Sequence, residues 1–298
     1  MLRQSQSLIS AAALAVALEG CATHGDMALS RGQLMAGLKH EMIANTSWPR
    51  IHAAEGLLDN GESEPVIAIF QSEADTAPAP YRIGVWRVLA RATTGSQRAG
   101  YVARIRGVIH DAAATDRLSA AETLGKLHAA TRADRKFIFE WLPAADDETA
   151  PYLWWLLVQT SGPAERKEDE AALAKLLASK DPVTRLRTAF ALGRLNELSP
   201  ESISKLTAKL KDEPFNSVAR VYLISALLLH EKDAPAAAAL KKQLVHYLDG
   251  RPNEQLEAAL VMGLAGTRED LARLKPLLGS PEADARIGAA NGILHLLK

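Results

Sequence analysis

The sequence predicts an all-α protein built from a row of helical hairpins. Blocks of small and apolar residues recur every 31–36 residues, and this period fits one helix–turn–helix unit per repeat. Alanine pairs lie in the middle of several blocks with leucines at helical spacing around them, as expected where helices approach closely. No alternating polar and apolar run long enough for a β-strand lies outside a helical pattern.

The N-terminus has the organisation of a bacterial export signal. Arg3 supplies a short positive region, and Leu8–Leu18 is an apolar run of 11 residues that is too short to span a bilayer. An ordinary secretion signal and a retained amphipathic helix are the alternatives to a lipoprotein signal.

The residues that follow this run favour the lipoprotein. Leu18-Glu19-Gly20-Cys21 resembles the bacterial lipobox, although Glu19 departs from its pattern. The resemblance implies a signal peptide at 1–20, lipidation of Cys21, and a place in the bacterial cell envelope on the periplasmic side or in the outer membrane. Membrane contact is then expected only through the lipid anchor.

A linker and a capping helix are expected next, at residues 21–44, with the helix running from Ser30 to Ile43. Repeats fill residues 45–298, and Val66–Phe70 fits a short second helix of the first hairpin. The last helix carries Ile293 and Leu296 with no following repeat to cover them, and an uncovered apolar face would favour self-association or a partner.

The repeat blocks share a length of seven residues and a helical spacing of leucine or isoleucine. They are Ile51–Leu57, Arg82–Val88, Leu118–Leu124, Leu186–Leu192, Val221–Leu227, Leu256–Met262 and Ile287–Ile293. The segment 149–179 is the most divergent. Asp181-Pro182, Ser199-Pro200 and Ser280-Pro281 each place an N-cap residue before a proline at a predicted helix start.

The phrases Asp181-Pro182-Val183-Thr184-Arg185 and Ala191-Leu192-Gly193-Arg194-Leu195 resemble HEAT-like repeats. The resemblance implies a right-handed α-solenoid of about seven hairpins over residues 45–298, and it implies little about function. Tetratricopeptide repeats have a similar length, but their Trp/Gly/Tyr pattern is absent from the sequence.

Three polar residues form a candidate site: His52, Glu55 and Glu122. Glu55 and Glu122 follow the same Arg-x-x-Ala-Ala-Glu-x-Leu frame two repeats apart. At about 8–10 Å per helix layer, we expect them on the order of 20 Å apart, which is too far for a catalytic pair of carboxylates. Inter-repeat ion pairs are the simpler interpretation. His52 and Glu55 share a helix face, but two ligands from one helix do not make a zinc site.

A basic stretch lies between Thr76 and His110, where no acidic residue occurs. Such a patch would suit an acidic glycan, a lipid surface or an acidic peptide, unless neighbouring repeats neutralise it through ion pairs. Its candidate binding residues are Arg82, Trp86, Arg87, Arg91 and Arg104.

A second candidate surface is aromatic. Trp154 and Trp155 lie in an aromatic-rich segment and point about 100° apart on a helix, so they do not both fit one buried seam. An exposed tryptophan would stack on a sugar or anchor a partner's side chain. Aromatic packing in the core of a divergent repeat is the alternative.

These observations favour a non-catalytic binding scaffold, anchored at the envelope, that offers a concave surface to a protein partner. A carbohydrate-binding or carbohydrate-processing accessory protein is the first alternative, and a HEAT-like enzyme such as a lyase is the second. The 35 basic and 35 acidic side chains cancel, which disfavours a nucleic-acid partner. With one cysteine and no phosphate loop or nucleophile elbow, we expect no catalytic residues, no metal and no cofactor.

Overall fold

The computed structural model describes residues 30–298, and residues 31–298 form one unit. The predicted signal peptide and Cys21 therefore lie outside the described residues. Within the described part of the chain, no helix is both long and apolar enough to cross a bilayer.

Helices make up the regular secondary structure, and residues 30–298 contain no strand, so the prediction of an all-α protein is confirmed. The predicted capping helix is displaced by only one residue at each end. The α-helices are α2 (Arg31–Ala44), α3 (Ser47–Asp59), α4 (Glu64–Phe70), α5 (Tyr81–Ala92), α6 (Gly95–His110), α7 (Arg117–Lys126), α8 (Asp134–Trp141), α9 (Ala150–Thr160), α10 (Pro163–Lys175), α11 (Pro182–Gly193), α12 (Pro200–Asp212), α13 (Arg220–His230), α14 (Ala234–Leu244), α15 (Pro252–Ala265), α16 (Leu271–Leu274) and α17 (Ala283–Leu296).

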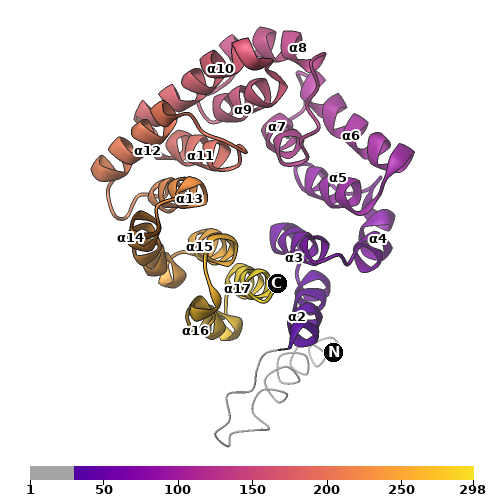
Figure 1. Cartoon of the computed structure of the whole chain (residues 1–298). Helices are drawn as coiled ribbons and strands as arrows, with labels where there is room; N and C mark the ends of the chain where they lie inside the picture. The colour runs from indigo at the N-terminus through magenta and orange to yellow at the C-terminus, as the bar shows by residue number, and fades with distance from the viewer. Residues whose placement is uncertain (1–29) are drawn as a thin grey trace, which may run out of the picture. The chain divides into compact units, whose positions relative to one another are not determined.

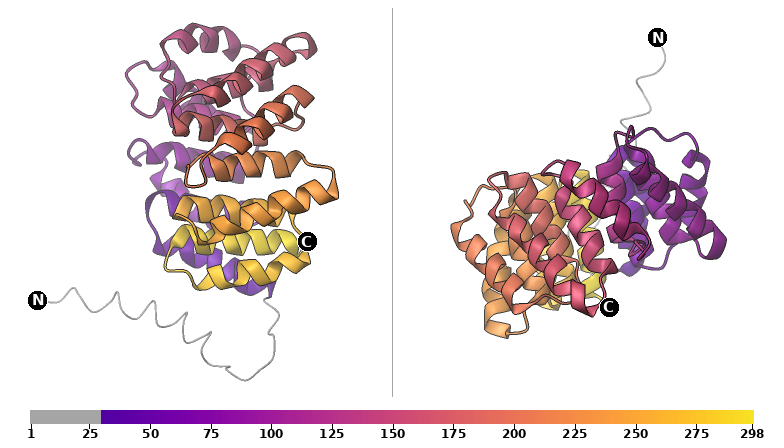
Figure 2. Two further views of the ribbon diagram at one scale, coloured as in Figure 1. Left: turned by 90° about the vertical axis from the view of Figure 1, so that its left-hand side faces the viewer. Right: turned by 90° about the horizontal axis from the view of Figure 1, so that it is seen from above.

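The helices are arranged in two layers around a closed ring (Figure 1). The odd-numbered helices α3 to α17 form the inner layer, and each of them contacts the next odd-numbered helix. The even-numbered helices α4 to α16 lie outside them. Helix α17 also packs against α2 and α3, so the last inner helix meets the first (Figures 1 and 2).

All seven repeat blocks lie on inner helices, and the eighth inner helix, α9, belongs to the divergent segment 149–179. Small residues in these blocks allow neighbouring inner helices to pack closely. A Cβ added to Gly263 on α15 would lie 2.4 Å from the Cα of Gly292 on α17, so this contact requires glycine. The alternation of small and large residues seen in the sequence therefore reflects packing within the inner layer.

Helix starts follow the predicted caps at two of three positions. The Asp181 side chain accepts hydrogen bonds from the backbone N–H groups of Val183 and Thr184, and Ser199 caps α12 in the same way. At the third position the prediction is wrong, because Ser280 follows a 3₁₀ turn at Lys275–Gly279 and α17 begins only at Ala283. The Ser280 hydroxyl instead accepts the N–H of Glu282 at 3.1 Å.

The seam where α17 meets α2 and α3 is held by both apolar and polar contacts. Ile293 is fully buried and Leu296 is 8% exposed, so the end of the helical array is covered rather than left free for self-association. Arg286 donates two hydrogen bonds to the buried Glu41 carboxylate, at 2.6 and 2.9 Å. His52 Nδ1 lies 2.9 Å from the carboxylate of Asp284. These contacts join residues 232 and 245 positions apart in the chain.

Candidate functional site

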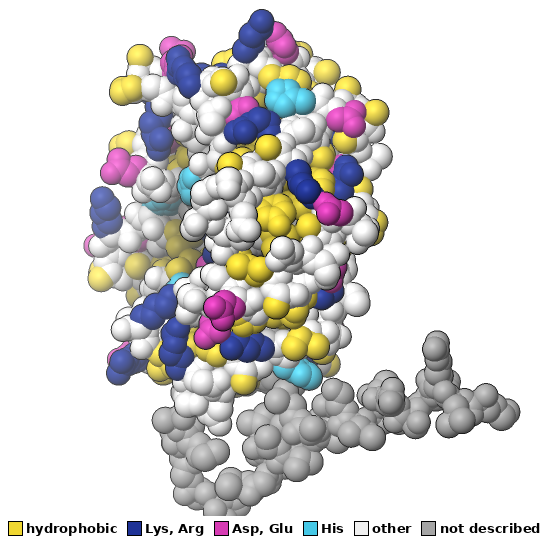
Figure 3. Space-filling model, turned by 90° about the vertical axis from the view of Figure 1, so that its right-hand side faces the viewer, with side chains coloured by type: hydrophobic (Ala, Val, Ile, Leu, Met, Phe, Trp, Pro, Cys, Tyr) yellow, Lys and Arg dark blue, Asp and Glu magenta, His cyan; other side chains and the backbone are white. Residues whose placement is uncertain are grey.

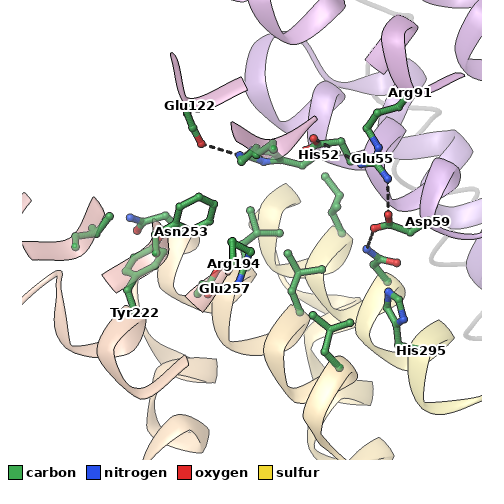
Figure 4. Close-up of a pocket in the computed structure, with 18 of the residues that line it drawn as sticks. His52, Glu55, Asp59, Arg91, Glu122, Arg194, Tyr222, Asn253, Glu257 and His295 are labelled. Carbon is green, nitrogen blue, oxygen red and sulfur yellow. Dashed lines mark hydrogen bonds and ion pairs between the residues drawn. The ribbon is translucent and has the colours of Figure 1, made fainter. Parts of the chain in front are cut away.

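A cavity of about 570 Å³ lies inside the ring. This volume is typical of sites for small organic ligands. Helices from the whole inner layer, α3 through α17, contribute to its wall. Ion pairs dominate the lining from α3, α5 and α7, which we call the charged half. The large apolar side chains gather on α11 to α17, which we call the apolar half, although Arg194, Asn253, Glu257 and His295 also lie on this side (Figure 4).

Helices α3, α5 and α7 supply the charged half, in which opposite charges are paired. The Arg87 guanidinium, buried behind the wall, lies 2.8 Å from a carboxylate oxygen of Glu55. Arg91 lies 2.5 Å from Asp59. On α7, Lys126 reaches Glu122 at 2.7 Å, one helical turn away. The charged half therefore offers both hydrogen-bond donors and acceptors with little net charge.

Glu55 and Glu122 line this cavity together. Burial raises the pKa of Glu122, but the positive charges of Lys126 and Arg87 outweigh burial and lower it overall. The negative charge of Glu55 also acts on Glu122 and raises its pKa. Arg87 connects the two groups, since it pairs with Glu55 and its charge also lowers the pKa of Glu122.

Glu55 is the more strongly perturbed carboxyl group. Burial raises its pKa, but Arg87, Lys126 and Arg91 together lower it from 4.5 to about 2. Both glutamates are therefore ionised at neutral pH. Glycosidic acid–base catalysis needs one carboxyl group that remains protonated, and neither glutamate meets that requirement.

The apolar half comes from α11, α13, α15 and α17. Leu256, Leu260 and Leu264 follow one another at four-residue intervals on a single face of α15. Leu264 is 54% exposed, which is unusual for a large apolar side chain in this protein. Beside this leucine row, the rings of Phe190 and Tyr222 lie 6.3 Å apart in an edge-to-face arrangement.

Cations border the apolar half where it meets the charged half. The Arg194 guanidinium lies 4.7 Å from the centre of the Phe190 ring, and the Lys126 ammonium lies 5.3 Å from it. Arg194 also pairs with Glu257 at 3.2 Å. Because both cations already lie against Phe190, this aromatic group is poorly suited to receive a cationic ligand.

The predicted basic stretch does not form a free basic surface. Arg82 pairs with Asp116 and Arg104 pairs with Asp75, and each partner lies about one repeat away in the chain. Arg87 and Arg91 likewise pair with carboxylates of α3. Trp86 is 9% exposed and donates its indole N–H to the carbonyl oxygen of Ala74 at 2.7 Å. On the face shown in Figure 3, basic side chains likewise lie among acidic ones.

The two adjacent tryptophans point to different places. Trp155 is fully buried and forms part of the cavity wall, with its ring 6.0 Å from Phe190. Trp154 instead packs edge-to-face against Phe139, at 6.4 Å, and does not line the cavity. The structure thus brings together His52, Glu55, Glu122, Arg91 and Trp155 at one cavity, and leaves Arg82, Trp86, Arg104 and Trp154 outside it.

Sequence reasoning missed the apolar half of the site, although the repeat blocks contain a signal for it. In five of the seven repeat blocks, the fifth residue lines the cavity. The residue four positions after it, one helical turn further on, lines the cavity as well. These residues are Glu55, Glu122, Phe190, Leu260 and Asn291, followed by Asp59, Lys126, Arg194, Leu264 and His295. Comparing equivalent positions across all repeats, rather than the two glutamates alone, would have identified this wall.

Among residues 30–298, no group of three or more His, Cys, Asp and Glu side chains is arranged to hold a metal ion. No protein-family model matches the chain, and no curated protein sequence matches it. Among solved structures, it is similar to an engineered protein from the Northeast Structural Genomics Consortium, at 16% identity over 90% of this chain and 79% of that chain. The TM-score of 0.36 is too low to support an argument about fold or function.

Proposed function

We propose that this protein binds a small amphipathic molecule in the central cavity of its ring and does not transform it. The observation that carries the proposal is the division of one cavity of about 570 Å³ into a wall of paired charges and a wall of leucine and aromatic side chains. An apolar part of the ligand would lie on Leu260 and Phe190, and its polar part would exchange hydrogen bonds with the charged wall.

Closure of the ring favours a small ligand over an extended one. In an open helical array the inner surface is free to receive a long partner. Here α17 packs against α3, so the inner surface surrounds a cavity. The alternative of a protein partner along a concave face therefore has less support than a small molecule. Binding is favoured over catalysis because Glu55 and Glu122, which both line this cavity, both have lowered pKa values.

Carbohydrate is the second candidate ligand, favoured by one observation. Phe190 and Tyr222 are half-buried aromatic rings in the same cavity as Glu55 and Glu122, and sugars combine ring stacking with hydrogen bonds to carboxylates. On α15, Asn253 and Glu257 could bind hydroxyl groups, but the row of three leucines on the same helix offers only apolar contact and favours an alkyl or aryl group over a sugar ring.

We also propose that the helix pairs are HEAT-like hairpins of a right-handed superhelix, and that Cys21 anchors the chain at a bacterial envelope. The seven blocks on the inner helices support the first part, and the lipobox resemblance supports the second. Incorporation of labelled palmitate into the wild-type chain but not into Cys21→Ser tests the anchor, and equal labelling of both would refute it.

A fluorescence titration tests ligand binding. N-phenyl-1-naphthylamine is a neutral, largely apolar probe whose emission rises in an apolar cavity, and we expect saturable binding to the purified chain. Leu264→Asn should weaken it about fivefold, because the ligand would cover the exposed half of this leucine, worth about 1 kcal/mol.

The matched control is Phe215→Asn, which removes a side chain that is 65% exposed and does not line the cavity. This variant should bind the probe as the wild type does. An unsaturable titration, or equal weakening by both substitutions, would contradict binding in the cavity.

A further inference from the structure

A second, smaller pocket of about 130 Å³ adjoins the central cavity. His128 and Arg194 line both, so these two side chains form the boundary between them. The other polar side chains of the small pocket are Gln159, Arg166 and Asn196. No carboxylate lines it, in contrast to the charged half of the central cavity.

Arg166 gives the small pocket an uncompensated positive charge. It is half-buried, and its guanidinium donates a hydrogen bond of 3.1 Å to the backbone carbonyl oxygen of Glu197. Among residues 30–298 it has no acidic partner, whereas Arg87, Arg91 and Arg194 each have one. A guanidinium without a carboxylate partner binds an anionic oxygen strongly and with defined geometry.

His128 adds an imidazole ring to the wall of the small pocket. Its Nδ1 lies 3.3 Å from the amide nitrogen of Gln159, which also donates a hydrogen bond to the carbonyl oxygen of Gly125 at 2.9 Å. The small pocket therefore combines two guanidinium groups with the side chains of a histidine, a glutamine and an asparagine.

Arg194 connects this cationic pocket to the apolar wall. It follows Phe190 by one helical turn, and its guanidinium lies over the Phe190 ring at 4.7 Å. A ligand lying on Phe190 and Leu260 would thus have its end at Arg194, next to Arg166. The apolar wall therefore lies next to the cationic pocket, just as the apolar body of an amphipathic acid lies next to its acid group.

Resting on the ligand-binding function proposed above, we propose that the ligand is an amphipathic acid. Its aryl or alkyl body lies on the leucine and aromatic wall, and its carboxylate or phosphate monoester group binds in the small pocket between Arg166 and Arg194. Carboxylate and phosphate share the chemistry that recognises them, namely anionic oxygens that accept paired N–H donors.

A matched pair of probes tests the acid group separately from the apolar body. 4-Phenylbutyrate and 4-phenylbutan-1-ol differ only in that group, and calorimetric titration at fixed ionic strength gives both dissociation constants. We expect the acid to bind at least tenfold more tightly than the alcohol. 4-Phenylbutyl phosphate shows which anion the pocket prefers, since the more tightly bound of the two acids identifies the better fit.

Arg166→Gln should reduce the difference between acid and alcohol to less than twofold while leaving alcohol binding unchanged. Arg194 is the poorer choice for substitution, because its loss would leave Glu257 without its cation. Lys167→Gln is the matched control: it removes the same charge from an exposed neighbouring position that does not line the pocket, and it should preserve the difference.

Each outcome decides between the two proposals. Equal binding of acid and alcohol, equal weakening of both by Arg166→Gln, or the same effect from Lys167→Gln would overturn the acid-binding pocket and leave the cavity proposal intact. Failure of both phenyl probes alongside saturable naphthylamine binding would do the same. If no probe binds at all, the function proposed above fails and the acid-binding pocket fails with it.

Discussion

Arg286→Met should weaken the ring at its seam. Arg286 donates two charge-assisted hydrogen bonds to Glu41, and the Glu41 side chain is only 7% exposed. Removing one partner of a buried ion pair costs about 3–5 kcal/mol because the other charge is left unpaired in the interior. The Arg286 side chain is 25% exposed, and Asn45 still donates to Glu41 at 2.7 Å, so we expect a loss of about 2–3 kcal/mol.

The assay is urea unfolding followed by circular dichroism. Lys205→Met is the control, since Lys205 pairs with Glu201 on the surface of one helix, and its loss should cost less than about 0.5 kcal/mol. Glu41→Ala combined with Arg286→Met should cost much less than the sum of the two single changes. Simple additivity would mean that the two residues do not meet, and the ring closure would be refuted.

Two further predictions concern the inner layer. Because the pKa of Glu55 is lowered from 4.5 to about 2, its contribution to stability is complete above pH 4.5 and disappears as the pH falls toward 2. Between pH 5 and 2 the wild type should lose up to roughly 3 kcal/mol more than Glu55→Gln in urea unfolding; parallel losses would contradict the pairing with Arg87. Gly263→Ala should cost about 1–3 kcal/mol, since its Cβ would lie 2.4 Å from Gly292 backbone. Gly100→Ala, in an open position on α6, should be neutral or stabilising by thermal unfolding, and an equal effect of the two would refute this close packing.

The helical class was predictable because its evidence is local. A period of 31–36 residues, alanine pairs between leucines, and caps such as Asp181-Pro182 all appear within short windows of sequence. Each corresponds to a contact between neighbouring helices or within one helix turn, so reading along the chain finds it. Ser280 is the exception, because its hydroxyl accepts the N–H of Glu282 in a turn and α17 begins at Ala283, two residues after Pro281.

The basic stretch shows why ion pairs between repeats, the alternative raised for it, are not visible within one segment. The stretch that contains Arg82, Arg91 and Arg104 has no acidic residue within it, so it looks like a basic surface in the sequence. The acids that neutralise these arginines lie 29–34 residues away, at Asp116, Asp59 and Asp75. In a protein made of repeats, neighbours in space are one period apart, and a charge run must be compared with the same position in the next repeat.

The cavity forms because the ring closes. Neither could be predicted from local sequence, because the contacts at the seam join residues more than 230 positions apart. Asp59 and Asn291 belong to both features: they hydrogen-bond across the seam at 3.0 Å and also line the cavity. A ligand that binds only the closed ring must therefore stabilise the seam, by about 2.7 kcal/mol at a hundred times its dissociation constant. We therefore expect ligand binding and ring closure to be coupled through Asp59 and Asn291, which belong to both the seam and the cavity.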